Sequence, residues 1–379
     1  MTNAVPGHGD RNPVYLDTAS SEPLHPAARE TFLAALDQGY ADPRRLHRPA
    51  RSARLLLDNA RAAVSESLDV RPDEVTFTAS GTEAVHRGLL GLARARSSRG
   101  SVLVHSAVEH SAVLHAADWG GQPVSVPVDA RGRVDAAVFT ERCADPDVAA
   151  AALQTANHEV GTLQPVGEFL LPNDVPLFVD AGASMGRLPL PDGWSAAAGS
   201  AHKWGGPAGV GILLVRTGVR WSNPFPGDDR VDHRTSGFEN VPAALAAAAA
   251  LQAVVAERDE VNARQFALID RIRTAVAGIP DTEVVGDPVD RLPHVVTFSC
   301  LYVAGEALVT ELDKRGFGVA SGSACTASTL EPSHVLSAMR VLTHGNVRVS
   351  LTRETTEADV DALLGALPGV VADLRAEVR

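Results

Sequence analysis

The sequence contains little cysteine, few aromatic residues and no excess of positive charge. Its three cysteines, Cys143, Cys300 and Cys325, lack the spacing of a disulfide framework or of a zinc site. The formal net charge of −12 argues against nucleic acid or an anionic membrane as a main partner. The N-terminal residues lack the basic and apolar regions of a signal peptide, and the alanine run 243–250 is too short to span a bilayer. We therefore expect a cytoplasmic protein whose cysteines are reduced.

Short apolar runs alternate with helical patterns over the first part of the chain. Strands are expected at 74–78, 101–105, 148–153, 176–179 and 210–215, and a helix at 82–96. The apolar runs show little alternation, which is typical of strands that helices cover on both faces. This order predicts an α/β fold with a mainly parallel, doubly wound sheet.

A long helical stretch at 242–278 separates this region from a shorter pattern. That pattern comprises strands at 295–299 and 346–351, a helix at 305–315 and a terminal helix from Glu357 onward. It predicts a smaller α+β domain. We assign residues 14–250 to a large domain and 251–379 to a small C-terminal domain, with the N-terminal segment 1–25 packing on the small domain.

Lys203 stands in the segment Ala198-Gly-Ser-Ala-His-Lys-Trp-Gly-Gly-Pro207. Lysines are usually solvated, but here small neighbours leave room for a bulky group at the amine. A desolvated lysine has a lowered pKa and can form a Schiff base with a carbonyl group. The segment makes Lys203 a candidate catalytic residue.

Three further segments place polar residues where predicted strands end. Asp180 follows a buried strand, where it could keep a pyridinium nitrogen protonated or simply cap a helix. The run Ser80-Gly81-Thr82 opens a helix, so its amides and hydroxyls could hold a phosphate or serve only as a cap. His110 could stack on an aromatic cofactor, or its ring could be satisfied by backbone groups. The spacing of five between neighbouring histidines is poor for a metal site.

Cys325 and Arg348 stand in contrasting surroundings. Cys325 lies among serine, glycine, alanine and threonine, as expected for an accessible nucleophile, whereas Cys300 in an apolar strand is expected to be buried and inert. Arg348 interrupts an apolar strand, so it needs a carboxylate partner. That partner is either a structural Asp or Glu or the α-carboxylate of a substrate.

In their order and spacing these segments resemble the cysteine desulfurases, in the class V aminotransferase group of fold-type I pyridoxal-phosphate enzymes. The resemblance runs from Val14-Tyr-Leu-Asp-Thr-Ala to the terminal helix. Its most specific block is Ser321-Gly-Ser-Ala-Cys-Thr with Glu331-Pro-Ser-His-Val-Leu, which looks like the branch with the long cysteine loop. The resemblance implies a seven-stranded, mainly parallel sheet in the large domain.

The resemblance also implies roles for individual residues. Lys203 would carry pyridoxal 5'-phosphate, Asp180 would pair with the ring nitrogen and His110 would stack on the ring. The remaining cofactor contacts would come from Ser80, Gly81, Thr82, His158, Ser200 and His202. Asn157 and Arg348 would bind L-cysteine. Cys325 would take its sulfur as a persulfide and release L-alanine. Homodimers and a sulfur-acceptor protein or enzyme are further implications.

Three positions depart from the family pattern, which indicates a specialised branch. His158 replaces the second of two asparagines, Ala183 replaces a glutamine near the cofactor hydroxyl, and Phe238 replaces a threonine that reaches the neighbouring subunit. Two other functions remain open. One is a related C–S lyase or selenocysteine lyase, and the other is an inactive family member that acts as a binding partner.

Overall fold

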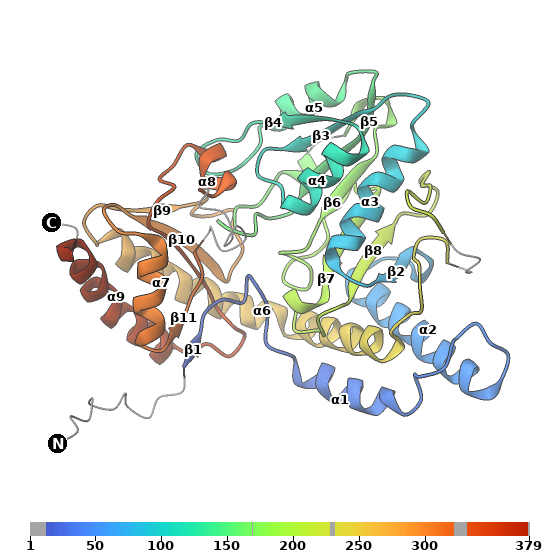
Figure 1. Ribbon diagram of the computed structural model, residues 1–379, viewed down its shortest axis with the longest axis horizontal. Coiled ribbons are helices and arrows are strands. Elements are labelled where there is room, and N and C mark those ends of the chain that lie inside the picture. Colours follow the sequence, from blue (N-terminus) through green and yellow to red (C-terminus); the bar gives the residue numbers. More distant parts are fainter. Residues whose placement is uncertain (1–12, 169, 228–231, 322–331, 378–379) are drawn as a thin grey trace.

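The computed structural model describes residues 13–168, 170–227, 232–321 and 332–377. Its largest element is a seven-stranded sheet with the order β2-β8-β7-β6-β5-β3-β4 (Figure 1). These strands are β2 (Val75–Thr78), β3 (Val102–Ser106), β4 (Gln122–Val126), β5 (Val148–Gln154), β6 (Leu177–Asp180), β7 (Ala196–Ser200) and β8 (Gly211–Val215). Strand β8 pairs antiparallel with both neighbours, and the other pairings in this sheet are parallel. The predicted α/β class with a mainly parallel sheet is confirmed.

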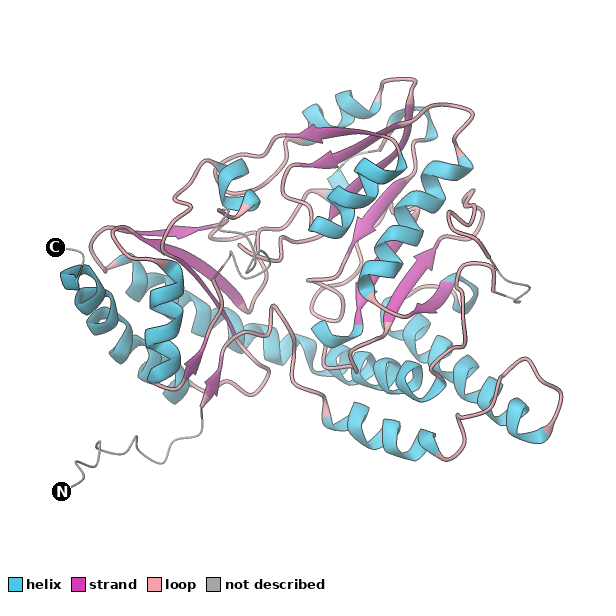
Figure 2. Ribbon diagram, in the orientation of Figure 1, coloured by secondary structure: helices cyan, strands magenta, loops and turns pink. Residues whose placement is uncertain are grey.

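Helices cover this sheet on both faces, which explains the continuous apolar runs (Figure 2). One face packs on α3 (Gly81–Ala95) and α4 (Ser111–Gly120), the other on α2 (Arg48–Leu68) and the start of α6 (Val241–Ala277). Strand β8 shows the alternation: Leu213 packs toward α3, whereas Ile212 and Leu214 pack toward α6. The helices α1 (Pro26–Leu36) and α5 (Ala136–Cys143) also contribute buried residues to the core between the sheet and α2 and α6.

The long helix α6 belongs to both domains. Its first part, to Leu251, is buried in the core of the large sheet, and residues from Leu268 to Val276 are buried in a separate core. Half of its most apolar 18-residue window is buried inside the protein. The predicted domain boundary at 250/251 therefore falls within a continuous helix rather than in a linker.

The smaller domain contains an antiparallel sheet with the order β12-β10-β9. Its elements are β9 (Thr282–Val285), β10 (Val295–Cys300), α7 (Gly305–Lys314), β11 (Phe317–Gly318), α8 (His334–Met339), β12 (Asn346–Ser350) and α9 (Glu357–Glu377). Strand β1 (Val14–Tyr15) pairs with β11, and Leu16 is buried in the core of this domain. The N-terminal segment thus lies on the small domain before the chain enters α1 (Figure 1).

Candidate active site

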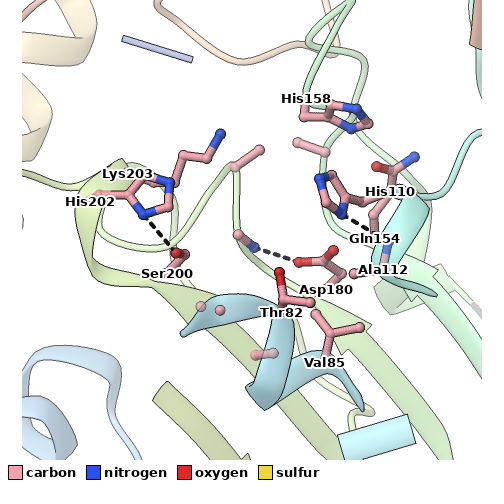
Figure 3. A pocket seen from close by; sticks show the side chains of 16 residues that line it. Thr82, Val85, His110, Ala112, Gln154, His158, Asp180, Ser200, His202 and Lys203 are labelled. Atoms are coloured by element: carbon pink, nitrogen blue, oxygen red, sulfur yellow. Dashed lines mark hydrogen bonds between the residues drawn. The ribbon is translucent and has the colours of Figure 1, made fainter. Parts of the chain in front are cut away.

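A cavity of about 170 Å³ opens at the carboxyl ends of β5, β6 and β7 (Figure 3). In open α/β sheets, ligands bind at this edge because the loops that follow the strands converge there. The lining residues are Gly81, Thr82, Val85, His110, Ala112, Gln154, Ala156, His158, Asp180, Gly182, Ala183, Ala198, Gly199, Ser200, His202 and Lys203. Eight of the twelve site residues predicted from the sequence are among them: Gly81, Thr82, His110, His158, Asp180, Ser200, His202 and Lys203.

One end of the cavity is formed by the N-terminus of α3. Ser80 caps this helix, because its hydroxyl accepts a 3.0 Å hydrogen bond from the amide of Glu83. Gly81 packs so closely on Ser200 that an added Cβ would lie 2.5 Å from the Ser200 Cβ. The Ser200 hydroxyl and Nδ1 of His202 are hydrogen-bonded at 3.0 Å. A helix N-terminus beside hydroxyl and imidazole groups is suited to a phosphate. Ser80 itself is engaged as a cap and does not line the cavity.

Asp180 places a carboxylate in the cavity from the last residue of β6. Its Oδ1 accepts a 2.8 Å hydrogen bond from the amide of Gly182, which fixes the side chain at the turn after the strand. Lys203 approaches from the 3₁₀ helix η4 (Ala201–Lys203), which follows β7. Its Nζ donates a hydrogen bond to the carbonyl oxygen of Ala19, so the N-terminal segment reaches the centre of the site.

His110 is held in one tautomer by the helix that it caps. Its Nδ1 accepts a 3.1 Å hydrogen bond from the amide of Ala112, and a backbone amide can only donate. Burial lowers the pKa of His110, although the carboxylate of Asp180 opposes this shift. The imidazole is therefore neutral near pH 7 and carries its proton on Nε2. It can donate that proton within the cavity (Figure 3).

His158 lies beside His110, with ring centroids 5.1 Å apart and an interplanar angle of 70°. Burial lowers the pKa of His158 well below its usual range, and the nearby positive charge of Lys203 lowers it further. Its Nε2 lies 3.7 Å from a carboxyl oxygen of Glu159. The structure thus places a second neutral imidazole in the wall of the cavity.

Two residues predicted to bind substrate do not line this cavity. The amide of Asn157 is completely buried: Oδ1 accepts hydrogen bonds from Glu159 and Val160, and Nδ2 donates to the carbonyl of Val108. Asn157 therefore shapes the loop after β5, and the prediction that it contacts substrate has no support in this geometry. Its Oδ1 accepts from two backbone N–H groups of this loop that would otherwise be buried without a hydrogen-bond acceptor.

Arg348 has a structural acidic partner, one of the two alternatives left open by the sequence. Its Nη2 donates to Asp17 at 2.8 Å and to Ser20 at 2.7 Å, and its Nη1 donates to the carbonyl of His158 at 3.0 Å. Its Nε is buried and has no hydrogen-bond partner among the residues that the structure describes. Arg348 thus contacts the site indirectly, through its hydrogen bond to His158, which lines the cavity.

The structure describes two of the three cysteines, and both are buried. Cys325 lies outside the described residues. Cys143 and Cys300 are buried and unpaired, and burial raises the pKa of Cys143 to about 12 and also raises that of Cys300. Neither is a nucleophile at neutral pH, because the thiolate is the reactive form. The expectation that Cys300 is buried is confirmed.

Sequence reasoning missed Gln154, which lines the cavity, and Glu109, which lies behind it. Glu109 is completely buried, and desolvation raises its pKa to about 8. Its Oε1 accepts hydrogen bonds from the hydroxyl of Ser106 and the amide of Gln154, and its Oε2 has no partner in the described part of the chain. The only signal in the sequence was its position directly before His110.

The fold and the cavity define an α/β protein with a ligand pocket at the carboxyl edge of its sheet, where a helix N-terminus, a carboxylate, a lysine and an imidazole converge. Residues 14–363 match the family described as Aminotransferase class-V. The chain belongs to this family. The predicted membership of the class V aminotransferase family is therefore confirmed.

Curated relatives within the family carry the name cysteine desulfurase. The chain is 38% identical to an IscS-like cysteine desulfurase of Mycobacterium tuberculosis, over 95% of this chain and 97% of the relative. It is 32% identical to the cysteine desulfurase IscS of Methanosarcina thermophila, over 96% and 93%. A solved structure described as a NifS-like protein superposes with a TM-score of 0.87 at 27% identity, covering 95% of this chain and all of that one.

Proposed function

We propose that this chain is a pyridoxal-phosphate-dependent cysteine desulfurase that converts L-cysteine to L-alanine and holds the sulfur as a persulfide on Cys325. The observation that carries the proposal is the convergence of Lys203, Asp180, His110 and the N-terminus of α3 on one cavity. The relatives named cysteine desulfurase, matched over nearly their full length, support the same reaction.

The residues present fit pyridoxal phosphate. Gly81 and Thr82, at the start of α3, with Ser200 and His202 would hold the phosphate, since Gly81 has no Cβ to block close approach. The carboxylate of Asp180 would pair with the ring nitrogen, and the amine of Lys203 would carry the cofactor's carbonyl carbon. When bound, this cofactor supplies an electron sink that lets the carbon–sulfur bond of the substrate break.

The side chains of this chain supply the remaining steps. His110, with its proton on Nε2, can donate to a group in the cavity and later take the proton back. The Cys325 thiolate forms a bond to the substrate sulfur while the carbon–sulfur bond breaks, and the electron pair of that bond stays with the carbon. Protonation of that carbon then completes L-alanine. Cys325 is left as a persulfide, which an acceptor protein or enzyme takes up.

A homodimer is the second part of the proposal. Large apolar side chains are exposed along one segment of the chain, on α1, on α2 and between these helices: Leu33, Leu36, Tyr40, Leu46 and Leu55. Phe238 is also exposed, and its neighbour Glu239 pairs with Arg44 of this segment. A second copy of the chain could cover these side chains. The unpaired state of Cys143 and Cys300 agrees with our further proposal of a reducing, cytoplasmic compartment.

Two variants test the reaction. In Cys325→Ala, sulfide release from L-cysteine in the presence of a thiol reductant should fall to near zero, whereas cofactor binding is unchanged. A C–S lyase or selenocysteine lyase that forms no lasting persulfide would retain the full rate. In Lys203→Ala the visible absorbance of the bound cofactor should be lost. An inactive binding partner would show no such absorbance in the wild-type protein either.

A further inference from the structure

A second cavity, which we call the amino-edge cavity, lies at the edge of the large sheet opposite the candidate active site. Its volume is about 350 Å³, and its wall includes Pro176 and Ser195, which precede β6 and β7. Arg96, directly after the last residue of α3, also lines it. The start of α3 lines the active site, so the two spaces lie at opposite ends of this 15-residue helix, about 22 Å apart at 1.5 Å per residue. The amino-edge cavity is therefore separate from the pocket assigned to the cofactor.

Two stretches of the chain without acidic residues supply much of the wall of this cavity. No aspartate or glutamate occurs at positions 84–108 or 193–227, although the whole chain has 46 acidic residues and a net charge of −12. The first stretch brings Arg96 and Arg99 to the amino-edge cavity, and the second brings Arg220. The local charge is thus opposite in sign to that of the protein as a whole.

The three arginines of the amino-edge cavity lie close together. Burial lowers the pKa of Arg96, the guanidinium groups of Arg99 and Arg220 lower it further, and Asp174 opposes the shift. Within the part of the chain that the structure describes, none of the three forms an ion pair, whereas many other arginines of this protein do. Asp174 is the single acidic residue among the described residues that line the cavity. Like charges held together with so little compensation favour the binding of an anion.

One guanidinium group is fixed in the wall of the cavity, and two are exposed. Arg96 donates from Nη1 to the carbonyl oxygen of Asp174 at 2.8 Å and from Nη2 to that of Asn173 at 3.1 Å. It therefore contributes a fixed positive charge. Arg99 and Arg220 are exposed, and their side chains make no hydrogen bond to another described residue. Their planar groups are thus available to bind an oxyanion.

We propose that the amino-edge cavity binds a small molecule through a phosphate group, which Arg99 and Arg220 hold by charge-assisted hydrogen bonds. The hydroxyl of Ser195 is a further donor, because it accepts from the amide of Leu177 at 3.2 Å and keeps its own proton for a ligand. A volume of about 350 Å³ is in the range of small-molecule pockets, whereas a protein partner needs roughly 800 Å² of surface on each side. The chain thus has a second ligand site, distinct from that of the desulfurase reaction.

Pyrophosphate tests the site on the holoenzyme, in which the cofactor occupies the active site. Titration calorimetry at constant ionic strength should give one bound pyrophosphate per chain, whereas acetate, with a single negative charge, should not bind detectably. Arg99→Ala and Arg220→Ala should each raise the dissociation constant of pyrophosphate about tenfold, as expected for loss of charge-assisted hydrogen bonds. Arg99→Lys keeps the charge but not the planar set of donors, so its affinity should fall between those of the wild type and Arg99→Ala.

Arg29→Ala is the matched control, because Arg29 is also exposed but lies on α1, outside the cavity. It should leave the affinity unchanged, and an equal loss in this variant would overturn the proposal, since it would show attraction to surface charge in general. Absence of binding, or an affinity that neither Arg99→Ala nor Arg220→Ala reduces, would overturn it as well. The visible absorbance of the cofactor should stay constant during the titration, and a change would place pyrophosphate in the active site instead. None of these measurements uses L-cysteine, so failure of the desulfurase reaction would be seen separately.

Discussion

The guanidinium of Arg348, in the middle of β12, lies 2.8 Å from the carboxylate of Asp17, which follows β1. The arginine side chain is 5% exposed, and that of Asp17 is 22% exposed. A strand near the C-terminus and a segment near the N-terminus are thus joined by an ion pair beside the cavity. The pair explains how an apolar strand tolerates a buried arginine.

Substitution of Asp17 should therefore destabilise the protein. Asp17→Asn keeps an oxygen that can accept from Nη2 but leaves the buried charge of Arg348 without its counter-ion. We expect a loss of about 2 kcal/mol in the free energy of unfolding, below the cost of breaking a fully buried pair because Asp17 is partly solvated. Denaturation in urea measures this loss. As a control, Asp259→Asn removes a carboxylate that is 99% exposed and should change little.

Glu109 should make the stability depend on pH. Its pKa in the folded protein is about 8, above its ordinary value of 4.5, because burial disfavours the carboxylate. The folded state thus binds this proton more tightly than the unfolded state. The contribution of Glu109 to stability is complete below about pH 4.5 and is lost as the pH rises through about 8, by about 5 kcal/mol in full.

Glu109→Gln isolates this effect. Glutamine keeps the oxygen that accepts from Ser106 and from the amide of Gln154 and has no charge to form. The variant should be more stable than the wild-type protein at pH 8 and of similar stability at pH 5, as measured by unfolding at both values. A difference that is the same at both pH values would show that Glu109 does not titrate in this range.

Gly81 should control cofactor affinity. A Cβ at this position would lie 2.5 Å from the Cβ of Ser200, so Gly81→Ala forces apart the start of α3 and the turn after β7. Overpacking of this kind costs about 1–3 kcal/mol, which corresponds to a roughly tenfold or larger loss in affinity for pyridoxal phosphate. Titration of the apoprotein with the cofactor measures it. Gly167→Ala, with nothing within 4 Å of the added methyl, should bind as the wild type does.

The cysteines should differ in reactivity. Cys143 and Cys300 are buried and have raised pKa values, so iodoacetamide should modify both slowly in the folded protein. Cys325 should react first. Peptide mapping after short exposure gives the order, and the denatured protein, in which all three react, is the control. Rapid modification of Cys143 or Cys300 in the folded protein would contradict the buried positions.

Much of the large sheet could be predicted from the sequence because its strands are apolar runs covered on both faces. Strand β8 is such a run, Ile-Leu-Leu-Val, and β5 is another. Strand β7 was missed: its sequence, Ala-Ala-Ala-Gly-Ser, has little intrinsic preference for a strand. It is a strand because β6 and β8 hydrogen-bond it on both sides.

The site residues that directly follow a strand could be predicted from the sequence, because ligands bind at the carboxyl ends of strands in this class of fold. Asp180 and Lys203 were placed by the strands that precede them, and the structure brings both to one cavity. The contacts of Asn157 and Arg348 were not predictable, since each depends on which distant group satisfies a buried polar atom.

The most direct test of the account is the fate of the substrate sulfur. Purified holoenzyme is incubated with L-cysteine, and both L-alanine and the mass of the peptide containing Cys325 are measured. We predict that L-alanine forms and that this peptide gains the mass of one sulfur atom, which a thiol reductant removes. Formation of L-alanine with no sulfur on Cys325, or at an undiminished rate in Cys325→Ala, would contradict the proposed reaction.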